Sequence, residues 1–358
     1  MHTDPPLPTV FTTAQALASG MTRHMVTGRL RSGRWRRLRV GIYCTAATWS
    51  AADARRRHVM MAWAAVRSRS GRGVISHVSA AALYGWPLPL DVPTTVALTA
   101  ASLRESTRSL EGLVVQVASL RDADVCRYRG LRVTAPARTV ADCLRHLPAA
   151  DAVAIADDAL ARGALTAEQL VEVVMQQETW PYAAKALRAL PLIDPRRESW
   201  LESFSFVRLS ERGVELPEPQ VEVLDARGRF VARVDGAWRK YGTVCEADGR
   251  GKYLTLLDPQ APADARRVAG AVLTEKQRED ALRSTGLEVV RWGTRDVVRD
   301  LPEVVARVHD AWGRGDPGRF RGTFRQPKPW SMLTPERFSA LESPPQPAWR
   351  EQAGGLRR

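Results

Sequence analysis

The sequence predicts a multidomain chain that combines α/β and α+β architecture. Its 358 residues exceed the usual length of one domain, and apolar residues, at 44%, are sufficient to form buried cores. Short apolar segments with the alternation of strands lie between helical segments that end at glycine. We therefore expect four consecutive parts, which cover residues 8–65, 73–192, 195–315 and 319–358.

The first part, residues 8–65, has the outline of a winged helix-turn-helix. Residues 13–18 and 22–31 are predicted helices, because a threonine stands at each start and a glycine follows each end. Residues 34–43 alternate apolar and basic side chains, which is typical of a strand or of a two-stranded wing. The side chains of the second helix that we expect in the core are Met25, Val26 and Leu30.

The second part, residues 73–192, has the pattern of an α+β body without a catalytic signature. A helix is expected after Ser76, and the neighbouring His77 is interpreted as a core or capping histidine. Strands are predicted at residues 95–98 and 113–117, and helices at residues 137–147, at 150–161 and from Thr166 onward.

The third part, residues 195–315, has the element order helix, strand, strand, strand, helix, strand, helix, which is an α/β arrangement. The predicted bounds of these elements are 196–211, 221–224, 230–238, 243–248, 263–284, 287–292 and 294–312, in that order. Residues 319–358 are rich in proline and contain scattered arginines, so this tail is predicted to be disordered.

Two acidic residues, Asp235 and Glu246, stand inside apolar strands of the third part. Such burial costs free energy unless something pairs with the charge, and neighbouring strands can place the two carboxylates side by side. Asp248 lies two residues beyond Glu246 and so faces the same side of its strand. Mg²⁺ (or Mn²⁺) prefers oxygen ligands of this kind and would offset the repulsion. In the alternative reading the acids are structural and pair with Arg233 and Arg250.

Two further residues extend the predicted acidic site. Glu202 lies on a helix whose apolar face includes Phe206 and Leu209, so its carboxylate is expected to face inward toward the sheet. Lys252 follows the third strand and is expected to steady the charge of a phosphate or to orient water. The predicted catalytic residues are Glu202, Asp235, Glu246 and Lys252, and the predicted metal ligands are Asp235, Glu246 and Asp248.

The whole chain has a net charge of +14. Within it, residues 21–43 contain seven arginines and no acid. A bias toward arginine codons would give the same total charge, so this clustering is the informative feature. In a helix-turn-helix the second helix enters the major groove, and Arg23 is the first candidate for a base contact. In the alternative reading this is a solvated face of a winged helix that binds protein. The predicted DNA-binding residues are Arg23, Thr27, Arg31, Arg34, Arg36, Arg37 and Arg39.

Other patterns in the sequence restrict the setting and the chemistry. The four cysteines form no CxxC pair, the first residues do not resemble a signal peptide, and no apolar run reaches about 18 residues. We therefore expect a cytoplasmic protein without a membrane partner. The sequence contains no GxxxxGK[ST], GxSxG or HExxH motif, which argues against nucleotide hydrolysis, serine hydrolysis and zinc proteolysis.

The third part resembles the restriction-endonuclease-like domains related to the very-short-patch repair endonuclease. The resemblance rests on Glu202, on Asp235 after a valine and on residues 246–253, 275–278 and 286–292. It implies a PD-(D/E)xK core in which acids on two adjacent strands, Asp235 and Glu246, bind Mg²⁺. Asp248 stands where the family pattern has its lysine. The resemblance therefore implies either that Asp248 is an extra ligand or that Lys252 or Lys276 takes the role of that lysine.

The first part resembles the winged-helix domain of AbiEi-type antitoxins, which are transcriptional regulators of type IV toxin–antitoxin systems. The segment GRWRRLRVGIY at residues 33–43 carries this similarity, and SHVSAA at residues 76–81 extends it. The resemblance implies that the chain binds its own promoter and has a cognate toxin as a partner.

Three functions remain open at this point. The first is a Mg²⁺-dependent endonuclease that hydrolyses DNA phosphodiester bonds. The alternative is an AbiEi-like antitoxin and transcriptional regulator whose nuclease-like domain is not catalytic. The third is a protein-interaction scaffold, for which no salt-sensitive DNA binding is expected. The sequence leaves the oligomeric state and the recognised DNA site open.

Overall fold

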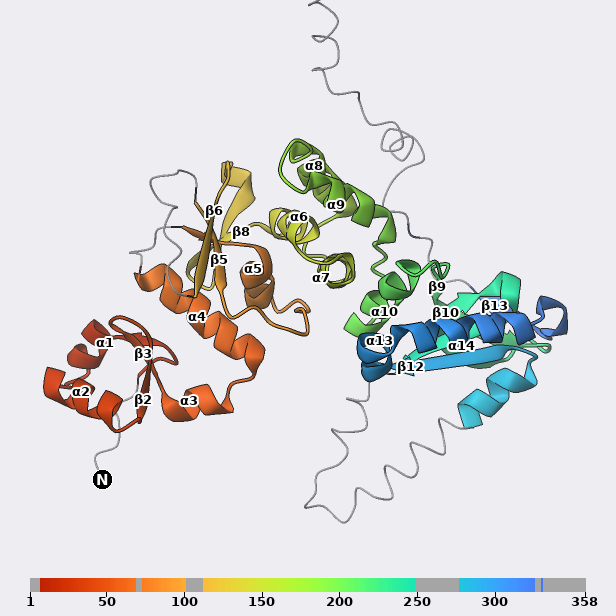
Figure 1. Ribbon diagram of the computed structural model, residues 1–358, viewed down its shortest axis with the longest axis horizontal. Helices are drawn as coiled ribbons and strands as arrows, with labels where there is room; N and C mark the ends of the chain where they lie inside the picture. The colour runs from red at the N-terminus through yellow and green to blue at the C-terminus, as the bar shows by residue number, and fades with distance from the viewer. Residues whose placement is uncertain (1–6, 69–72, 101–111, 249–276, 326–329, 331–358) are drawn as a thin grey trace, which may run out of the picture.

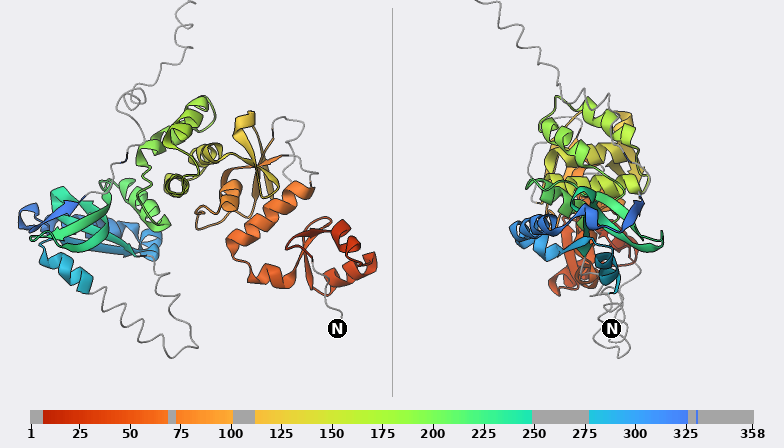
Figure 2. Two further views of the ribbon diagram at one scale, coloured as in Figure 1. Left: turned by 180° about the vertical axis from the view of Figure 1, so that it is seen from behind. Right: turned by 90° about the vertical axis from the view of Figure 1, so that its right-hand side faces the viewer.

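The computed structural model describes residues 7–68, 73–100, 112–248 and 277–325, together with Trp330. These residues form a mixed α/β structure with three sheets, whose strand orders are β1-β3-β2, β6-β5-β4-β8-β7 and β12-β11-β10-β9-β13. The three sheets follow one another along the long axis of the molecule, each with its own helices (Figures 1 and 2). The expectation of a multidomain α/β and α+β chain is confirmed at this coarse level.

The first sheet is formed by short strands and packs against a pair of helices. Its elements are β1 (Phe11–Thr12), α1 (Thr13–Ala18), α2 (Arg23–Arg31), β2 (Trp35–Arg39) and β3 (Ile42–Thr45). Both predicted helices are present, because Thr12 and Thr22 each accept a hydrogen bond from a backbone amide of the first turn. The basic alternating segment forms two antiparallel strands, β2 and β3.

This sheet has a hydrophobic core on each of its two faces. Trp35 packs with residues of α1 and α2, whereas Leu38 packs with α4 (Ala54–Ser68), which follows α3 (Ala46–Ala51). The expected core positions of α2 are partly wrong. Val26 is buried, but Met25 has 38% of its surface exposed because its position on the helix faces solvent.

Helices α4 and α5 (His77–Tyr84) pack together on one apolar face of the second sheet, and α6 (Pro136–His146) packs against α5 (Figure 1). The strands of this sheet are β4 (Val74–Ile75), β5 (Val96–Ala100), β6 (Leu113–Val117), β7 (Val125–Tyr128) and β8 (Leu131–Thr134). The other helices are α7 (Ala149–Ala161), α8 (Ala167–Gln176) and α9 (Ala183–Ala189). The helices predicted here are confirmed, and Thr166 caps α8 as expected.

The third sheet is built from β9 (Glu218–Asp225), β10 (Phe230–Trp238), β11 (Thr243–Asp248), β12 (Glu288–Gly293) and β13 (Gly322–Arg325). Strands β9, β10 and β11 are antiparallel neighbours, and β12 runs parallel to β11. The helices are α10 (Trp200–Ser210), α13 (Thr294–Arg299) and α14 (Leu301–Arg314), and the described residues 277–284 are also helical. The order of elements agrees with the sequence prediction as far as the described residues extend.

Two predictions for this region are wrong. The helix expected at residues 294–312 is interrupted at Asp300, because Pro302 lacks an amide hydrogen and is tolerated only in the first turn of a new helix. The tail predicted to be disordered from Arg319 contains β13, which pairs antiparallel with β9, so the prediction is wrong for this strand, whereas residues 326–329 and 331–358 lie outside the described residues. Most of the helix predicted at residues 263–284 lies outside the described residues.

A continuous cluster of buried apolar side chains joins the helical layer of the second sheet to the third sheet. It runs from Leu144 on α6 and Ile155 on α7 through Phe206 on α10 to Trp292 and Val308. Helix α10 packs against α7 (Figure 1). Glu202 therefore stands on the helix that joins these two packed parts of the chain. None of the helices in the described part is long and apolar enough to span a membrane.

Candidate functional site

Helix α2 presents the predicted DNA-contacting residues to solvent. Arg23, Thr27 and Arg31 are all exposed, and the Thr27 hydroxyl donates a hydrogen bond to the Arg23 carbonyl oxygen over 3.1 Å. The Thr22 side chain caps the helix through the Met25 amide at 3.2 Å. The helix contains no acidic residue, so its exposed face is purely cationic and can approach phosphates.

The predicted arginines at residues 34–39 differ in their contacts. Arg34, Arg36 and Arg37 are exposed, as expected. Arg36 also lies over the ring of Trp49 in α3, with its guanidinium carbon 4.5 Å from the ring centroid. Arg39 is half-buried and donates to the carbonyl oxygen of Gly112, the residue before β6, over 3.3 Å. The seven predicted residues therefore do not share one face of the sheet.

Asp235 is placed by the pairing of β10 with β11. Gly236 opposes Cys245, and the Asp235 Oδ2 atom accepts a hydrogen bond from the Ala247 amide over 2.7 Å. Burial, and secondarily the nearby Glu202 carboxylate, raise the pKa of Asp235 to about 6. The carboxylate is therefore fixed in position and energetically costly to ionise.

Glu246 is more deeply buried, with 3% of its surface exposed. Its Oε2 atom accepts a hydrogen bond from the Arg278 guanidinium over 2.9 Å, whereas its buried Oε1 atom has no hydrogen-bond partner among the described residues. Burial first, and then the negative charge of Asp235, raise the pKa of Glu246 to about 7, although Arg278 opposes the shift. Asp235 and Glu246 thus lie within electrostatic range of each other, as the sequence predicts.

Glu202 faces inward from the first turn of α10, which confirms the expected orientation. Its Oε2 atom accepts hydrogen bonds from the Glu198 amide over 3.0 Å and from the Gln220 side-chain amide over 2.8 Å. Phe206 and Leu209 are buried on the same helix. These contacts anchor Glu202 to β9.

The other residues assigned to the acidic site are either more exposed or outside the described residues. Asp248 has 42% of its side chain exposed and lies 3.5 Å from an Arg291 guanidinium nitrogen. Lys252, Lys276 and Arg250 lie outside the described residues. Arg233 pairs with Glu198 over 2.7 Å. The partner of Glu246 is instead Arg278, which stands on the helical segment 277–284 and was assigned no role from the sequence.

The acidic residues meet the needs of a divalent ion only as a pair. Across the described parts of the chain, no group of three or more His, Cys, Asp or Glu residues has an arrangement that could hold a metal ion. Mg²⁺, however, commonly takes one or two carboxylates and completes its shell with water and phosphate. Asp235 and Glu246 supply two carboxylates, and the Glu246 Oε1 atom, which has no hydrogen-bond partner in the described part of the chain, is a hard oxygen ligand.

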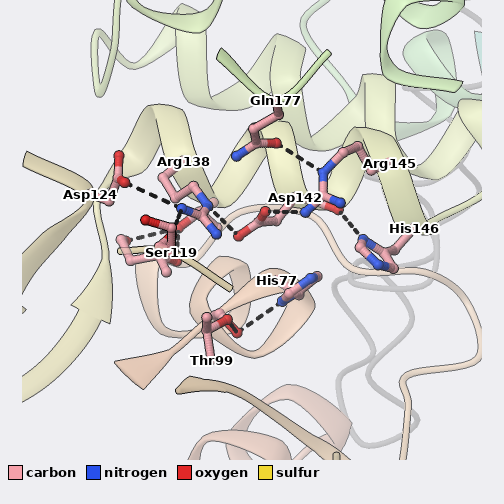
Figure 3. Close-up of polar contacts among 12 residues, drawn as sticks. His77, Thr99, Ser119, Asp124, Arg138, Asp142, Arg145, His146 and Gln177 are labelled. Atoms are coloured by element: carbon pink, nitrogen blue, oxygen red, sulfur yellow. Dashed lines mark hydrogen bonds and ion pairs between the residues drawn. The ribbon is translucent and has the colours of Figure 1, made fainter. Parts of the chain in front are cut away.

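A second buried polar cluster lies in the middle of the molecule (Figure 3). On α6, Asp142 accepts a hydrogen bond from Arg138 over 2.9 Å through Oδ2 and another from Arg145 over 2.7 Å through Oδ1. Arg138 also reaches Asp124 over 3.3 Å, and Arg145 reaches Gln177 over 2.9 Å. Each of the two carboxylates therefore has guanidinium partners, which for Asp124 include the partly exposed Arg121.

His77 borders this cluster at the start of α5. Its Nδ1 atom lies 2.8 Å from the Ser76 hydroxyl, which also accepts a hydrogen bond from Thr99 over 2.8 Å. The His77 ring packs edge-on against His146 with centroids 4.7 Å apart. Burial lowers the pKa of His77 to about 4, so the ring is neutral near pH 7. This placement fits the structural role expected for His77.

Comparisons with known proteins found relatives over a large share of the chain and a family match over a shorter segment. Two proteins of Mycobacterium tuberculosis, the Uncharacterized protein MT2308 of strain CDC 1551 / Oshkosh and the Uncharacterized protein Rv2248 of strain ATCC 25618 / H37Rv, are each 29% identical to it over 238 residues. That match covers 66% of this chain and 80% of each relative.

A solved structure, the crystal structure of the RV2827C protein from Mycobacterium tuberculosis, is 16% identical. It covers 51% of this chain and 71% of that chain, with a TM-score of 0.36. Residues 9–46 match the model of the family described as "Transcriptional regulator, AbiEi antitoxin". This segment coincides with β1, α1, α2, β2 and β3. Residues 9–46 are therefore similar to the AbiEi antitoxin family.

Proposed function

We propose that the protein is a DNA-binding transcriptional regulator of the AbiEi antitoxin type. In this proposal residues 8–65 form a winged helix-turn-helix, α2 enters the major groove, and the β2–β3 hairpin is the wing. The observation that carries the proposal is the family match over residues 9–46, which covers α2 with its exposed, acid-free face. The net charge of +14 favours the same class of partner.

Sequence recognition is assigned to the exposed side chains of α2. Arg23 stands in the first turn of the helix, whose N-terminal residues contact base edges in this motif. A bidentate arginine–guanine contact contributes about 1–3 kcal/mol of discrimination. Thr27 lies one turn further along the same helix face, and Arg31, Arg34 and Arg37 are assigned to phosphates.

The test is binding of the full chain to a duplex that covers its own upstream region, measured by fluorescence anisotropy against a scrambled duplex. The Arg23→Ala variant should weaken binding to the upstream duplex roughly five- to 100-fold and reduce its preference over the scrambled one. Arg188→Ala, which removes the same charge from an exposed position of α9, is the matched control. An equal loss of affinity in both variants would mean that binding depends only on the total charge of the protein. No binding by the wild type would refute the proposal.

An antitoxin-type regulator has a cognate toxin as its second partner. The proposal therefore includes a cognate toxin as a partner of this chain. It also includes a restriction-endonuclease-like fold for residues 195–315, which serves binding rather than catalysis. In support, the described elements run α10, β9, β10, β11, helix 277–284, β12, α13 and α14. Glu246→Ala should then leave DNA binding unchanged, because a regulator does not need this carboxylate.

The second candidate function is Mg²⁺-dependent hydrolysis of a DNA phosphodiester bond. The observation that favours it is the buried Glu246 Oε1 atom, which has no hydrogen-bond partner among the described residues. Asp235 and Glu246 would hold the ion, with Asp248 as a further ligand. A bound divalent ion supplies Lewis acidity and lowers the pKa of a coordinated water. Glu202 would hold β9 and α10 in place around the site, and Lys252 retains its predicted role beside a phosphate.

Cleavage of supercoiled and linear DNA with Mg²⁺ or Mn²⁺ tests this second candidate. Nicking that depends on the metal and is lost in Glu246→Ala would establish an enzyme. The absence of nicking by both proteins, with DNA binding intact in both, would leave the regulator. Nicking that survives in Glu246→Ala would place the activity elsewhere or in a contaminant.

A further inference from the structure

A groove runs between β2 and α4, on the side of the first sheet away from α2. It encloses about 890 Å³ and extends to residues 92–94 and to Gly112 of the second part of the chain. Four arginines line it, namely Arg36, Arg37, Arg39 and Arg57, and its described lining includes no Asp or Glu. A hollow with this one-sided charge favours a polyanion over an apolar or cationic partner.

Trp49 of α3 holds two of these arginines in place. The guanidinium carbons of Arg36 and Arg57 lie 4.5 Å and 5.6 Å from the centroid of its ring. The Arg57 Nε atom also donates to the Trp49 carbonyl oxygen over 3.1 Å. Cationic groups that are held by stacking lose less conformational freedom on binding a phosphate than free side chains do. The groove is therefore a preorganised set of charges.

The groove is continuous with the surface assigned to DNA. Strand β2 is an edge strand, because the order of its sheet is β1-β3-β2. It carries the groove arginines Arg36, Arg37 and Arg39, and the exposed Arg34 directly precedes it. Three arginines along one edge strand can contact more than one phosphate of the same DNA strand.

We propose that the β2–α4 groove, with Arg57 as its contribution from α4, binds the sugar-phosphate backbone of the same DNA that α2 reads. The DNA contact then passes around the edge of β2 and reaches α4, beyond the segment similar to the antitoxin family. This inference rests on the proposed DNA-binding function. It assigns the groove to sequence-independent affinity and leaves base recognition to α2.

The test compares matched pairs of variants in the full chain. Arg57→Gln removes the groove charge but retains an amide that can donate to the α3 carbonyl, and Arg56→Gln removes the same charge from an exposed neighbour outside the groove. Ala54→Glu introduces an acid at an exposed groove position. Ala51→Glu introduces the same acid at an exposed position outside the groove. Binding to a duplex of about three helical turns is measured by fluorescence anisotropy between roughly 50 and 200 mM salt.

The expected result is a smaller salt dependence in Arg57→Gln, with the slope of log K against log salt reduced by about 0.9, and an unchanged slope in Arg56→Gln. Ala54→Glu should weaken binding more than Ala51→Glu, although both variants have the same net charge. If the members of each pair behave alike while the wild type binds DNA, the groove proposal is overturned and the proposed function stands. If the wild type binds no duplex, both are overturned.

Discussion

The molecule contains two buried clusters of charged side chains, and they differ in how their charges are balanced. In the cluster on α6, Arg138 bridges Asp124 and Asp142, Arg145 also pairs with Asp142, and the partly exposed Arg121 also pairs with Asp124. In the cluster on β10 and β11, Arg278 contacts Glu246 and Arg291 acts on it at longer range, whereas Asp235 accepts only a backbone hydrogen bond among the described residues. Both sets of carboxylates are largely buried, but only in the first does each carboxylate have a guanidinium partner within the described part of the chain.

This difference affects how readily the buried carboxyl groups of the acidic cluster ionise. The Asp142 carboxylate has a guanidinium on each oxygen, whereas burial first, and then neighbouring carboxylates, raise the pKa values of Asp235 and Glu246 to about 6 and about 7. A balanced cluster contributes structure, since every charge depends on its partners. An unbalanced cluster requires protons or a cation near pH 7, and such clusters occur at functional sites more often than elsewhere.

The largest expected effect is the loss of the carboxylate that binds both arginines. Asp142→Asn should lower the free energy of unfolding by about 3–5 kcal/mol, because two buried guanidinium groups lose their shared counter-charge. Urea unfolding followed by circular dichroism measures the change. Glu211→Ala, which removes a partly exposed ion pair with Arg208, should cost less than about 1 kcal/mol. A cost of that size in Asp142→Asn as well would show that the α6 cluster contributes little stability.

The pH dependence of stability separates the two clusters by sign. His77 has a pKa of about 4 in the folded state, below the ordinary value of 6.5, because of its burial. Between these values the unfolded chain binds a proton that the folded chain does not, so this group makes stability fall as pH drops from about 6.5 to about 4. Asn tolerates the positive φ of 52° at this position.

As the pH falls from about 6.5 to about 4, the free energy of unfolding of His77→Asn should therefore decrease by roughly 3 kcal/mol less than that of the wild type. The quantity to compare is the difference between variant and wild type at each pH, from urea unfolding. His24→Asn, at an exposed position of α2, is the control and should follow the wild type. A constant difference between His77→Asn and the wild type would mean that His77 titrates equally in both states.

Glu246 should show the opposite sign. Its folded-state pKa of about 7 exceeds the ordinary value of 4.5, so between these values the folded chain holds a proton that the unfolded chain releases. The contribution of Glu246 to the free energy of unfolding is then fully present below about pH 4.5, and it is lost as the pH rises through 7. In the presence of a chelator, Glu246→Gln should be about 2–3 kcal/mol more stable than the wild type at pH 8 and equal to it near pH 4.5.

The control for this measurement is Glu288→Gln, which removes a half-exposed carboxylate next to Arg314. It should change stability little at either pH. If Glu246→Gln were less stable than the wild type at pH 8, the Arg278 contact would outweigh the cost of burial. The acidic cluster would then resemble the α6 cluster in its energetics.

The parts of this fold that could be predicted are those determined by local sequence. Thr22 and Thr166 cap their helices through contacts within one turn, so their positions follow from a few residues. The proximity of Asp235 and Glu246 also follows from a short connection between two strands that pair antiparallel. For the same reason the inward orientation of Glu202 could be inferred from the apolar spacing on its own helix.

The features that were missed depend on distant parts of the chain. Strand β13 has few residues and exists through its pairing with β9, about a hundred positions earlier, so its proline-rich surroundings suggested disorder. Arg278 reaches Glu246 across a long sequence separation, and Arg36 turns toward Trp49 because α3 packs on that face of the sheet. Tertiary packing decided these positions, and no local pattern marks them.

The smallest expected effect tests the charge imbalance directly with a cation. At pH 8, Mg²⁺ at about ten times its dissociation constant should stabilise the wild type by about 1.4 kcal/mol, which raises the thermal midpoint by a few degrees. Glu246→Gln should lose this shift, since the Oε1 atom no longer carries charge. Asp142→Asn should keep it at a lower midpoint, because its cluster is separate. An equal shift in wild type and Glu246→Gln would place the ion elsewhere, and the acidic cluster would then satisfy its charge by holding protons.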